Sequence, residues 1–165
     1  MVDIVDAKTR SQMMAGIRSE KTQPEMFVRS SLHRSGFRFA RNSGALIGKP
    51  DIVLPRWKVL VFVHGSFWHM HGCNLSRLPD SNRDFWAKKL SANKVRDEKT
   101  ARKLISQGWR ILTVWECSVR GASARRKFES KLDQMSLWVR DQHAGICCDL
   151  YQDQIVFSEN IDESN

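Results

Sequence analysis

Residues 48–64 read GKPDIVLPRWKVLVFVH, and the fold that we expect for the chain is built around this segment. Two apolar runs rich in β-branched residues, DIVL at 51–54 and KVLVFV at 58–63, lie on either side of a Pro-Arg turn. Such a pair of runs predicts a β-hairpin. Because the two ends of an antiparallel hairpin lie side by side, we expect Asp51 at the start of one arm to neighbour His64 at the end of the other.

The segments on both sides of the hairpin carry the patterns of helices and further strands. A helix opens at Thr22, where Thr22-Gln23-Pro24-Glu25 has the spacing of a capping box with a proline in the first turn. This order of elements predicts one domain with a mixed α/β sheet flanked by helices. The other expected elements are helices over 8–18, 83–92, 93–107 and 123–142, and strands over 37–39 and 109–115.

Charge is distributed unevenly along the 165 residues. All 27 Lys and Arg residues precede position 151, whereas four of the 18 acidic residues follow it, so the net charge is +9 for the whole chain and +13 for the first 150 residues. A domain this basic attracts phosphate polyanions, although a basic protein without a nucleic-acid role has the same composition. With no apolar run long enough for a bilayer and no secretory signal, we expect a cytoplasmic protein without membrane contact.

Asp51 and two nearby histidines are suited to metal-assisted cleavage of a phosphodiester. Asp51 follows a Gly-x-Pro turn at the end of a strand, and carboxylate oxygens are the ligands that Mg²⁺ prefers. His64 and His69 follow the hairpin, and a histidine is able to deprotonate a water near neutral pH. Together these groups neutralise phosphate charge and activate the attacking water. Glu25 offers a second carboxylate, although the capping box explains it equally well.

A second group of metal-ligand residues lies close by in the sequence. His71 and Cys73, with the distant Cys117, are suitable zinc ligands. The fourth ligand then has to be water, Ser66, or one of the adjacent cysteines at 147–148. In the alternative interpretation, the cysteines are buried hydrophobic residues and the histidines are polar loop residues.

Aromatic and basic residues surround the same segment. Phe67 and Trp68 are adjacent in a His- and Gly-rich loop, where burying both is awkward, and exposed aromatic side chains next to a basic surface insert between base pairs in some proteins. The alternative is that one of the two simply fills the core. Residues 83–110 hold nine Lys and Arg against three acidic residues, which favours a surface that contacts phosphates, although solvated basic helices are also common.

Five ordered motifs connect this sequence with a known family. They are Asp6-x-x-Thr9-Arg10-Ser11 with Met14, Gly48-x-Pro50-Asp51, Phe62-Val63-His64-Gly65-x-Phe67-Trp68-His69-x-His71-x-Cys73, Phe85-Trp86-x-x-Lys89-x-x-x-Asn93-x-x-Arg96-Asp97 and Gly108-Trp109-Arg110-x-Leu112-x-Val114-Trp115-Glu116-Cys117. On these motifs the sequence resembles the very short patch repair (Vsr) DNA mismatch endonucleases, which nick DNA at thymine–guanine mismatches left by deamination of 5-methylcytosine.

The resemblance implies a restriction-endonuclease-like core of the PD-(D/E)xK type. It implies a DNA-contacting arm over residues 1–20, an endonuclease domain over 21–150 and an acidic tail over 151–165. The expected activity is Mg²⁺-dependent nicking 5′ to the mismatched thymine. The expected partners are double-stranded DNA with such a mismatch and downstream repair proteins, and we expect a monomer that works at the nucleoid.

The resemblance also implies roles for particular residues. Asp51 and the Val63 carbonyl bind Mg²⁺, His69 is the general base, His64 contacts the scissile phosphate, and Glu25 supports the hydrated metal. Phe67 and Trp68 intercalate from one groove and Met14 from the other, while Lys89 and Asn93 lie near the mismatch. The complete set of residues implied to contact DNA is Met14, Phe67, Trp68, Trp86, Lys89, Asn93 and Arg96.

One position, Ser66, departs from the family pattern. The family's structural zinc site normally has a cysteine where this chain has Ser66, whereas His71, Cys73 and Cys117 are retained. A serine hydroxyl must lose a proton to compete with a thiolate, so it is a poor zinc ligand.

The alternative functions are a related restriction-type endonuclease without mismatch specificity and a catalytically inactive mismatch-binding module.

Overall fold

The computed structural model describes residues 21–40, 46–151 and 154–159, so the helix and arm expected within residues 1–20, Met14 included, lie outside the described part of the chain. A five-stranded sheet in the order β1-β2-β3-β4-β5 forms the centre. β2, β3 and β4 run parallel, while β1 and β5 are antiparallel to their neighbours, which confirms the predicted mixed sheet. The strands are Ile52–Leu54, Val59–His64, Arg110–Trp115, Cys147–Tyr151 and Gln154–Ser158.

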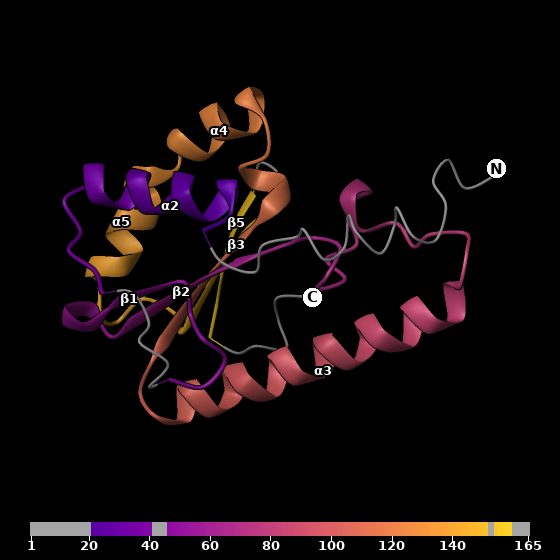
Figure 1. Ribbon diagram of the computed structural model, residues 1–165. Coiled ribbons are helices and arrows are strands. Elements are labelled where there is room, and N and C mark those ends of the chain that lie inside the picture. The colour runs from indigo at the N-terminus through magenta and orange to yellow at the C-terminus, as the bar shows by residue number, and fades with distance from the viewer. Residues whose placement is uncertain (1–20, 41–45, 152–153, 160–165) are drawn as a thin grey trace.

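Helices cover both faces of this sheet (Figure 1). Helices α2 (Gln23–Arg34), α4 (Ala122–Glu129) and α5 (Leu132–Arg140) lie over one face, and the long helix α3 (Arg83–Ser106) crosses the other. α3 joins β2 to β3, and the α4–α5 pair joins β3 to β4, because parallel neighbours need crossover connections. Three short 3-10 helices are also present: η1 (Pro55–Trp57), η2 (Asn74–Ser76) and η3 (Glu116–Ser118).

Side chains of β2 alternate between two hydrophobic cores. Val59 and Val61 belong to the larger core, with residues of α2 and α5, whereas Leu60 and Phe62 belong to the smaller core, with residues of α3. A strand that is covered on both faces needs apolar residues at every position, which explains the uninterrupted run VLVFV. His64 has the same parity as Leu60 and Phe62, so its side chain faces the α3 side of the sheet.

The predicted hairpin and the predicted helix after Thr22 are both confirmed. β1 pairs with β2 through Ile52 opposite Val61, and η1 makes the turn between them. The backbone N–H of Glu25 donates to the Thr22 hydroxyl at 3.4 Å, and the backbone N–H of Thr22 donates to the Glu25 carboxylate at 3.3 Å, so the capping box forms in full. Gly36, at φ +84°, follows the end of α2.

Two expectations about helices were wrong. The stretch 83–107 forms one helix rather than two, because the Asn93 side chain donates to the Trp68 carbonyl at 3.1 Å instead of capping a new helix. The stretch 123–142 forms two helices rather than one. The Ser130 hydroxyl donates to the Lys127 carbonyl at 2.8 Å, a local bond that competes with helix continuation, and the chain breaks there between α4 and α5.

The strand predictions were incomplete at both ends of the domain. Residues 37–39 form no strand, and only Ala40 makes an isolated bridge, to Val53. Strands β4 and β5 were not predicted, because their short runs CCDLY and QIVFS include charged or polar residues. β5 also lies within 151–165, which was expected to be a tail, so the sheet extends to Ser158. None of the helices in the described ranges is long and apolar enough to cross a membrane.

Arg110 begins β3 and turns its charged group into the protein, with only 9% of its surface exposed. Its Nη2 donates to the Trp138 carbonyl at 2.7 Å and its Nη1 to the Val139 carbonyl at 3.3 Å, while the guanidinium carbon lies 4.0 Å from the Trp138 ring centroid. Both carbonyls belong to the last turn of α5, where a helix lacks internal donors and its dipole favours a cation. Arg110 therefore ties the central strand to α5.

Replacing Arg110 with Met should destabilise the fold, because it leaves these two buried carbonyls without a donor. We expect the free energy of unfolding to fall by roughly 3 kcal/mol, measured by urea denaturation. Arg120→Met is the matched control: its exposed guanidinium pairs with Glu116 across one helical turn, so its loss should cost less than about 0.5 kcal/mol. Equal denaturation midpoints for the two variants would contradict this role of Arg110.

Candidate active site

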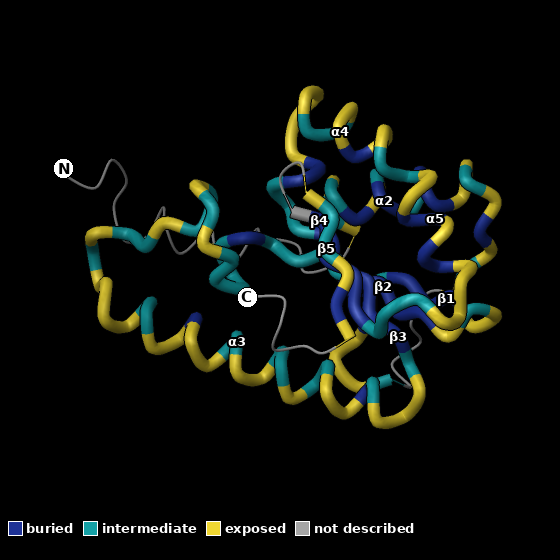
Figure 2. The backbone as a smooth tube through the Cα atoms, turned by 180° about the vertical axis from the view of Figure 1, so that it is seen from behind, coloured by how far each residue is buried: buried dark blue, intermediate teal, exposed yellow. Residues whose placement is uncertain are grey.

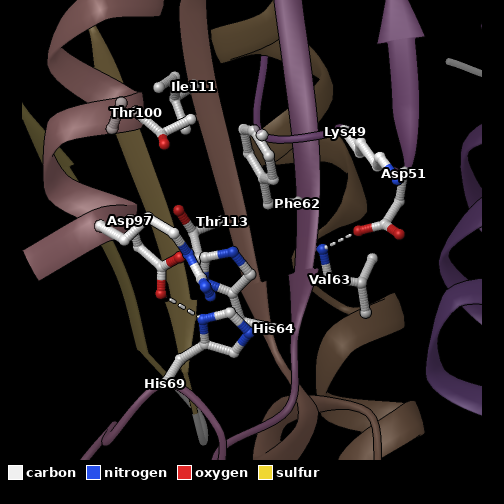
Figure 3. Close-up of a pocket in the computed structure, with 13 residues that line it drawn as sticks. Lys49, Asp51, Phe62, Val63, His64, His69, Asp97, Thr100, Ile111 and Thr113 are labelled. Atoms are coloured by element: carbon white, nitrogen blue, oxygen red, sulfur yellow. Dashed lines mark hydrogen bonds and ion pairs between the residues drawn. The ribbon is translucent and has the colours of Figure 1, made fainter. Parts of the chain in front are cut away.

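A cavity of about 590 Å³ lies between α3 and the end of β2 (Figure 3). Asp51, Val63, His64 and His69 line it, so the structure brings together the residues that the sequence singled out for catalysis, except Glu25. Arg96, predicted to contact DNA, lines the same cavity from α3. The wall on the far side from the sheet is therefore formed by α3.

The glycine before Asp51 permits this close approach. Gly48 has φ +72°, and a Cβ at this position would clash with the side chain of Thr100 on α3. A residue with a side chain would be strained here and would push the turn away from the helix. The Gly48-x-Pro50-Asp51 turn therefore holds the aspartate against the α3 side of the sheet.

Asp51 is fixed by bonds to both its backbone and its carboxylate. Its N–H donates to the Val61 carbonyl at 2.9 Å, and its Oδ2 accepts from the Val63 N–H at 2.7 Å. Burial raises the pKa of this carboxyl from 3.8 to about 6, against the lowering effect of the Val63 N–H. Glu25 also raises the pKa, while Arg29 and His69 lower it. A buried carboxylate that is costly to ionise is well suited to hold a cation.

Glu25 lies behind this aspartate rather than in the cavity. Its side chain is buried and forms an ion pair with Arg29 at 2.5 Å, and Arg29 in turn donates to the Asp51 carbonyl at 2.8 Å. Arg29 therefore connects the two acidic residues. Glu25 fills the capping-box role that its sequence position suggested and also places a charge near Asp51, whereas its role in supporting a hydrated metal stays a prediction.

His64 and His69 stack face to face, with ring centroids 3.9 Å apart and planes at 2°. Burial, together with the neighbouring His69, lowers the pKa of His64 to about 3, so His64 is neutral at physiological pH. Two stacked imidazoles this close disfavour a double positive charge. In this pair, His64 is therefore the neutral ring, and His69 is the ring that has a polar partner.

That partner is Asp97 of α3, which the sequence reasoning did not assign to the site. Nδ1 of His69 lies 2.5 Å from Oδ2 of Asp97, as the dashed line in Figure 3 marks. A carboxylate only accepts, so Nδ1 carries the proton and Nε2 keeps its lone pair. The signal for Asp97 was available: it follows Trp86 and Asn93 by 11 and four positions, at helical spacing, on a face that meets the histidine loop.

The loop from Gly65 to His71 forms a single helical turn next to the cavity. The N–H of His69 donates to the Gly65 carbonyl at 3.2 Å and that of His71 to the Ser66 carbonyl at 3.1 Å. Phe67 and Trp68 are half-buried and pack edge-on against each other, with ring centroids 5.1 Å apart. The loop thus presents two aromatic side chains beside the two histidines.

The first half of α3 completes this aromatic cluster. The Trp86 ring lies 5.5 Å from Phe67 and 6.1 Å from Trp68, and the ammonium of Lys89 lies 5.3 Å from the Trp86 ring. Asn93 donates to the Trp68 carbonyl, one turn further along. All six described residues predicted to contact DNA therefore belong to this loop or to α3, and most of α3 is exposed (Figure 2).

His71, Cys73 and Cys117 form a second cluster behind the loop. Their ligand atoms all lie within 4.8 Å of one another, and within the described ranges they are the only such group of His, Cys, Asp and Glu. Burial lowers the pKa of His71, which keeps the imidazole neutral and able to bind a metal. Cys147 and Cys148 lie elsewhere, buried in β4, and burial raises the thiol pKa of Cys147 to about 11.

Three described groups thus converge at one end of the sheet. The buried carboxylate of Asp51 can hold a hard cation, and the His69 imidazole, oriented by Asp97, can accept a proton. The aromatic cluster around Trp68 lies beside both groups. This combination is suited to hydrolysis of a phosphodiester next to stacked bases.

Comparisons with known proteins agree with that chemistry. A family model described as DNA mismatch endonuclease Vsr matches residues 2–75. The type II nicking enzyme V.XorIIP of Xanthomonas oryzae pv. oryzae is 43% identical over 119 residues, which are 72% of this chain and 88% of the relative. V.NmeAIP of Neisseria meningitidis, also named a type II nicking enzyme, is 41% identical over 132 residues, 80% of this chain and 94% of the relative.

The DNA mismatch endonuclease Vsr of Escherichia coli is 36% identical to this chain over 141 residues. The match covers 84% of this chain and 88% of that enzyme. The mixed five-stranded sheet with flanking helices is the restriction-endonuclease-like fold that the resemblance implied. The chain therefore belongs to the Vsr family of DNA endonucleases.

Proposed function

We propose that this endonuclease nicks one strand of duplex DNA 5′ to the thymine of a thymine–guanine mismatch, with Mg²⁺ as its metal. One observation carries the proposal: the Asp51 carboxylate and the His69 imidazole line the same cavity. Relatives named as nicking enzymes support cleavage of a single strand, and a relative named as a mismatch endonuclease supports the substrate.

Asp51 would hold the metal through the carboxylate oxygen that does not accept from the Val63 N–H, with the Val63 carbonyl as a further ligand. The donor set fits, because carboxylate and carbonyl oxygens are the ligands that Mg²⁺ takes. A Mg²⁺ ion held there would supply neutralisation of the phosphate charge and acidification of a water. The carboxyl pKa of about 6 means that Asp51 is mostly ionised, and ready for a cation, above that pH.

His69 is the general base in this proposal. Asp97 accepts from Nδ1, so Nε2 is the nitrogen that takes a proton from the attacking water. Asp97 also stabilises the imidazolium that results, as a carboxylate does in other histidine-dependent hydrolases. Stacked beneath it, His64 stays neutral and donates one ring N–H to the scissile phosphate without adding a second charge.

The aromatic cluster supplies substrate selection. Phe67 and Trp68 would insert between base pairs, which costs unstacking energy, and a mismatched pair stacks and pairs less well than a matched one. Asn93 holds the Trp68 carbonyl to α3, so the inserting loop stays in register with the catalytic residues. The lysines and arginines of α3 would contact the phosphates on either side.

We also propose a structural zinc ion at His71, Cys73 and Cys117. Cys117 Sγ and His71 Nδ1 lie 3.6 Å apart, which matches the separation of about 3.6 Å between sulfur and nitrogen ligands on a tetrahedral zinc. His71 and Cys73 belong to the histidine loop and Cys117 to η3, so a bound zinc ion would hold the loop against η3.

The direct test is a nicking assay on paired duplexes with a single thymine–guanine mismatch or the matched thymine–adenine pair. With Mg²⁺ we expect one nick, 5′ to the thymine, in the mismatched duplex only. Asp51→Ala should reduce the rate by about 1000-fold or more, because it removes the metal ligand. Asp133→Ala, at an exposed position of α5, is the control.

Two outcomes would count against the proposal. Equal cleavage of both duplexes would favour a restriction-type nuclease, and tight mismatch binding without product at any Mg²⁺ concentration would favour a pure binding module.

Asp97→Asn should slow single-turnover nicking by about 100-fold or more, while the Kd for mismatched DNA changes little. The amide retains the shape but removes the charge that fixes the His69 tautomer. The pH profile of the rate should shift as well, which a merely structural role would not cause. Glu98→Gln, at the next acidic residue on α3, is the matched control. Equal slowing in both variants would argue against a catalytic role of the His69–Asp97 pair.

Asp51→Asn should stabilise the protein in the absence of divalent metal. Folding raises the pKa of this carboxyl from 3.8 to about 6, so its ionisation disfavours the folded state. The parent therefore loses stability as the pH rises from about 3.8 to about 6, and the loss is complete above that range. We expect the variant to be more stable by roughly 2 kcal/mol at pH 7.5, with no difference below pH ~4. Thermal denaturation across this range measures the effect, and a variant less stable at pH 7.5 would refute it.

A further inference from the structure

The Ser66 hydroxyl is a buried polar group without a satisfactory partner. Ser66 has no exposed surface, and its Oγ makes no hydrogen bond of normal geometry to any described residue. Leaving a buried hydroxyl unpaired costs free energy, so such a group in a folded protein calls for an explanation. The explanation must come from what surrounds it.

Ser66 adjoins the ligand cluster rather than a core. Its carbonyl accepts from the His71 N–H at 3.1 Å, which folds the loop so that His71 returns next to it. Burial raises the pKa of the Cys73 thiol, and the Ser66 hydroxyl lies close enough to that thiol to lower its pKa again. The unpaired oxygen therefore belongs to the same small space as the three ligand atoms of His71, Cys73 and Cys117.

Three protein ligands leave a tetrahedral zinc with one open position. Closed structural sites have four Cys or His ligands, whereas a site with three keeps a water in the fourth position. A neutral serine hydroxyl is a weak ligand because it keeps its proton, but it hydrogen-bonds well to a metal-bound water.

We propose that this chain binds zinc through His71, Cys73 and Cys117 with an exchangeable water as the fourth ligand, hydrogen-bonded by Ser66. The inference rests on the zinc site proposed above and extends it. With only three protein ligands the ion is bound less tightly than in a closed site, so its occupancy follows the available zinc concentration. A water is displaced far more easily than a thiolate, so zinc enters and leaves this site without unfolding the loop.

Ring contacts connect this site to the catalytic histidines. The His71 ring stacks on Trp115, with centroids 4.3 Å apart, and Trp115 lies 5.3 Å from His64 and 6.5 Å from His69. Fixing His71 on a metal therefore fixes the ring against which the histidine pair rests.

Zinc affinity measured by competition with a chromophoric chelator tests the open position. Compared with the parent, Ser66→Cys should bind zinc about 100-fold more tightly or better, because it replaces the water with a thiolate. Ser66→Ala should bind about 10-fold more weakly, because the water loses its hydrogen bond. Cys117→Ser should bind far more weakly still, which confirms the location. A parent that binds as tightly as Ser66→Cys would overturn the proposal.

Cobalt(II) gives an independent readout of the coordination. In the cobalt-loaded parent, added imidazole should shift the visible absorption spectrum, since it displaces the water, while the Ser66→Cys protein should show no shift. Identical spectra with and without imidazole in both proteins would refute an open position. Circular dichroism of each metal-free variant checks folding. These measurements need no DNA, so a failed zinc result leaves the mismatch-nicking proposal standing, and a failed nicking assay leaves this one.

Discussion

The hydrogen bond from the Val63 N–H to the Asp51 carboxylate is the interaction on which the site depends. It continues the β1–β2 ladder beyond Ile52 and fixes the register of a hairpin whose first strand has only three residues. A slip of one residue would exchange the two faces of the strand, so that the aspartate would point toward α2 and lose the cavity. The same bond uses one carboxylate oxygen and leaves the other for a cation. The register of the hairpin and the proposed metal site thus depend on a single side chain.

Helix α3 then connects the residues proposed for substrate selection to the residues proposed for catalysis. One face of it contacts the loop after β2 at three levels, through Trp86, Asn93 and Asp97. Because Trp68 and His69 are adjacent in the chain, the turn that holds the aromatic residue proposed to insert also holds the proposed base. A duplex that cannot accept the aromatic side chain would disturb the loop just where the base is attached. If the proposed roles hold, discrimination of substrate and rate of reaction would therefore be difficult to separate in this fold.

The sequence predicted the hairpin, helix α2 and strand β3 because their patterns are local: alternating burial, a capping box and β-branched runs. It failed where distant contacts decide. Asn93 continues α3 because its amide finds the Trp68 carbonyl, 25 residues away, rather than its own helix. β4 and β5 carry no strong alternation and depend on pairing with a neighbouring strand, β4 with β3 and β5 with β4. Asp51, His64 and His69 were found from residue type and motif, whereas Asp97 required knowing which face of α3 meets the loop.

The length of α3 has a mechanical consequence. Its 24 residues bury only Leu90 and Leu104, and its C-terminal end is the part that packs on the smaller core. At about 1.5 Å per residue, a tilt of roughly 5° at the packed end displaces the opposite end by about 3 Å. The aromatic cluster sits near that opposite end, so small adjustments in the sheet are magnified into movements comparable to the spacing between stacked base pairs. A bent or unwound duplex can thereby be followed without rebuilding the domain.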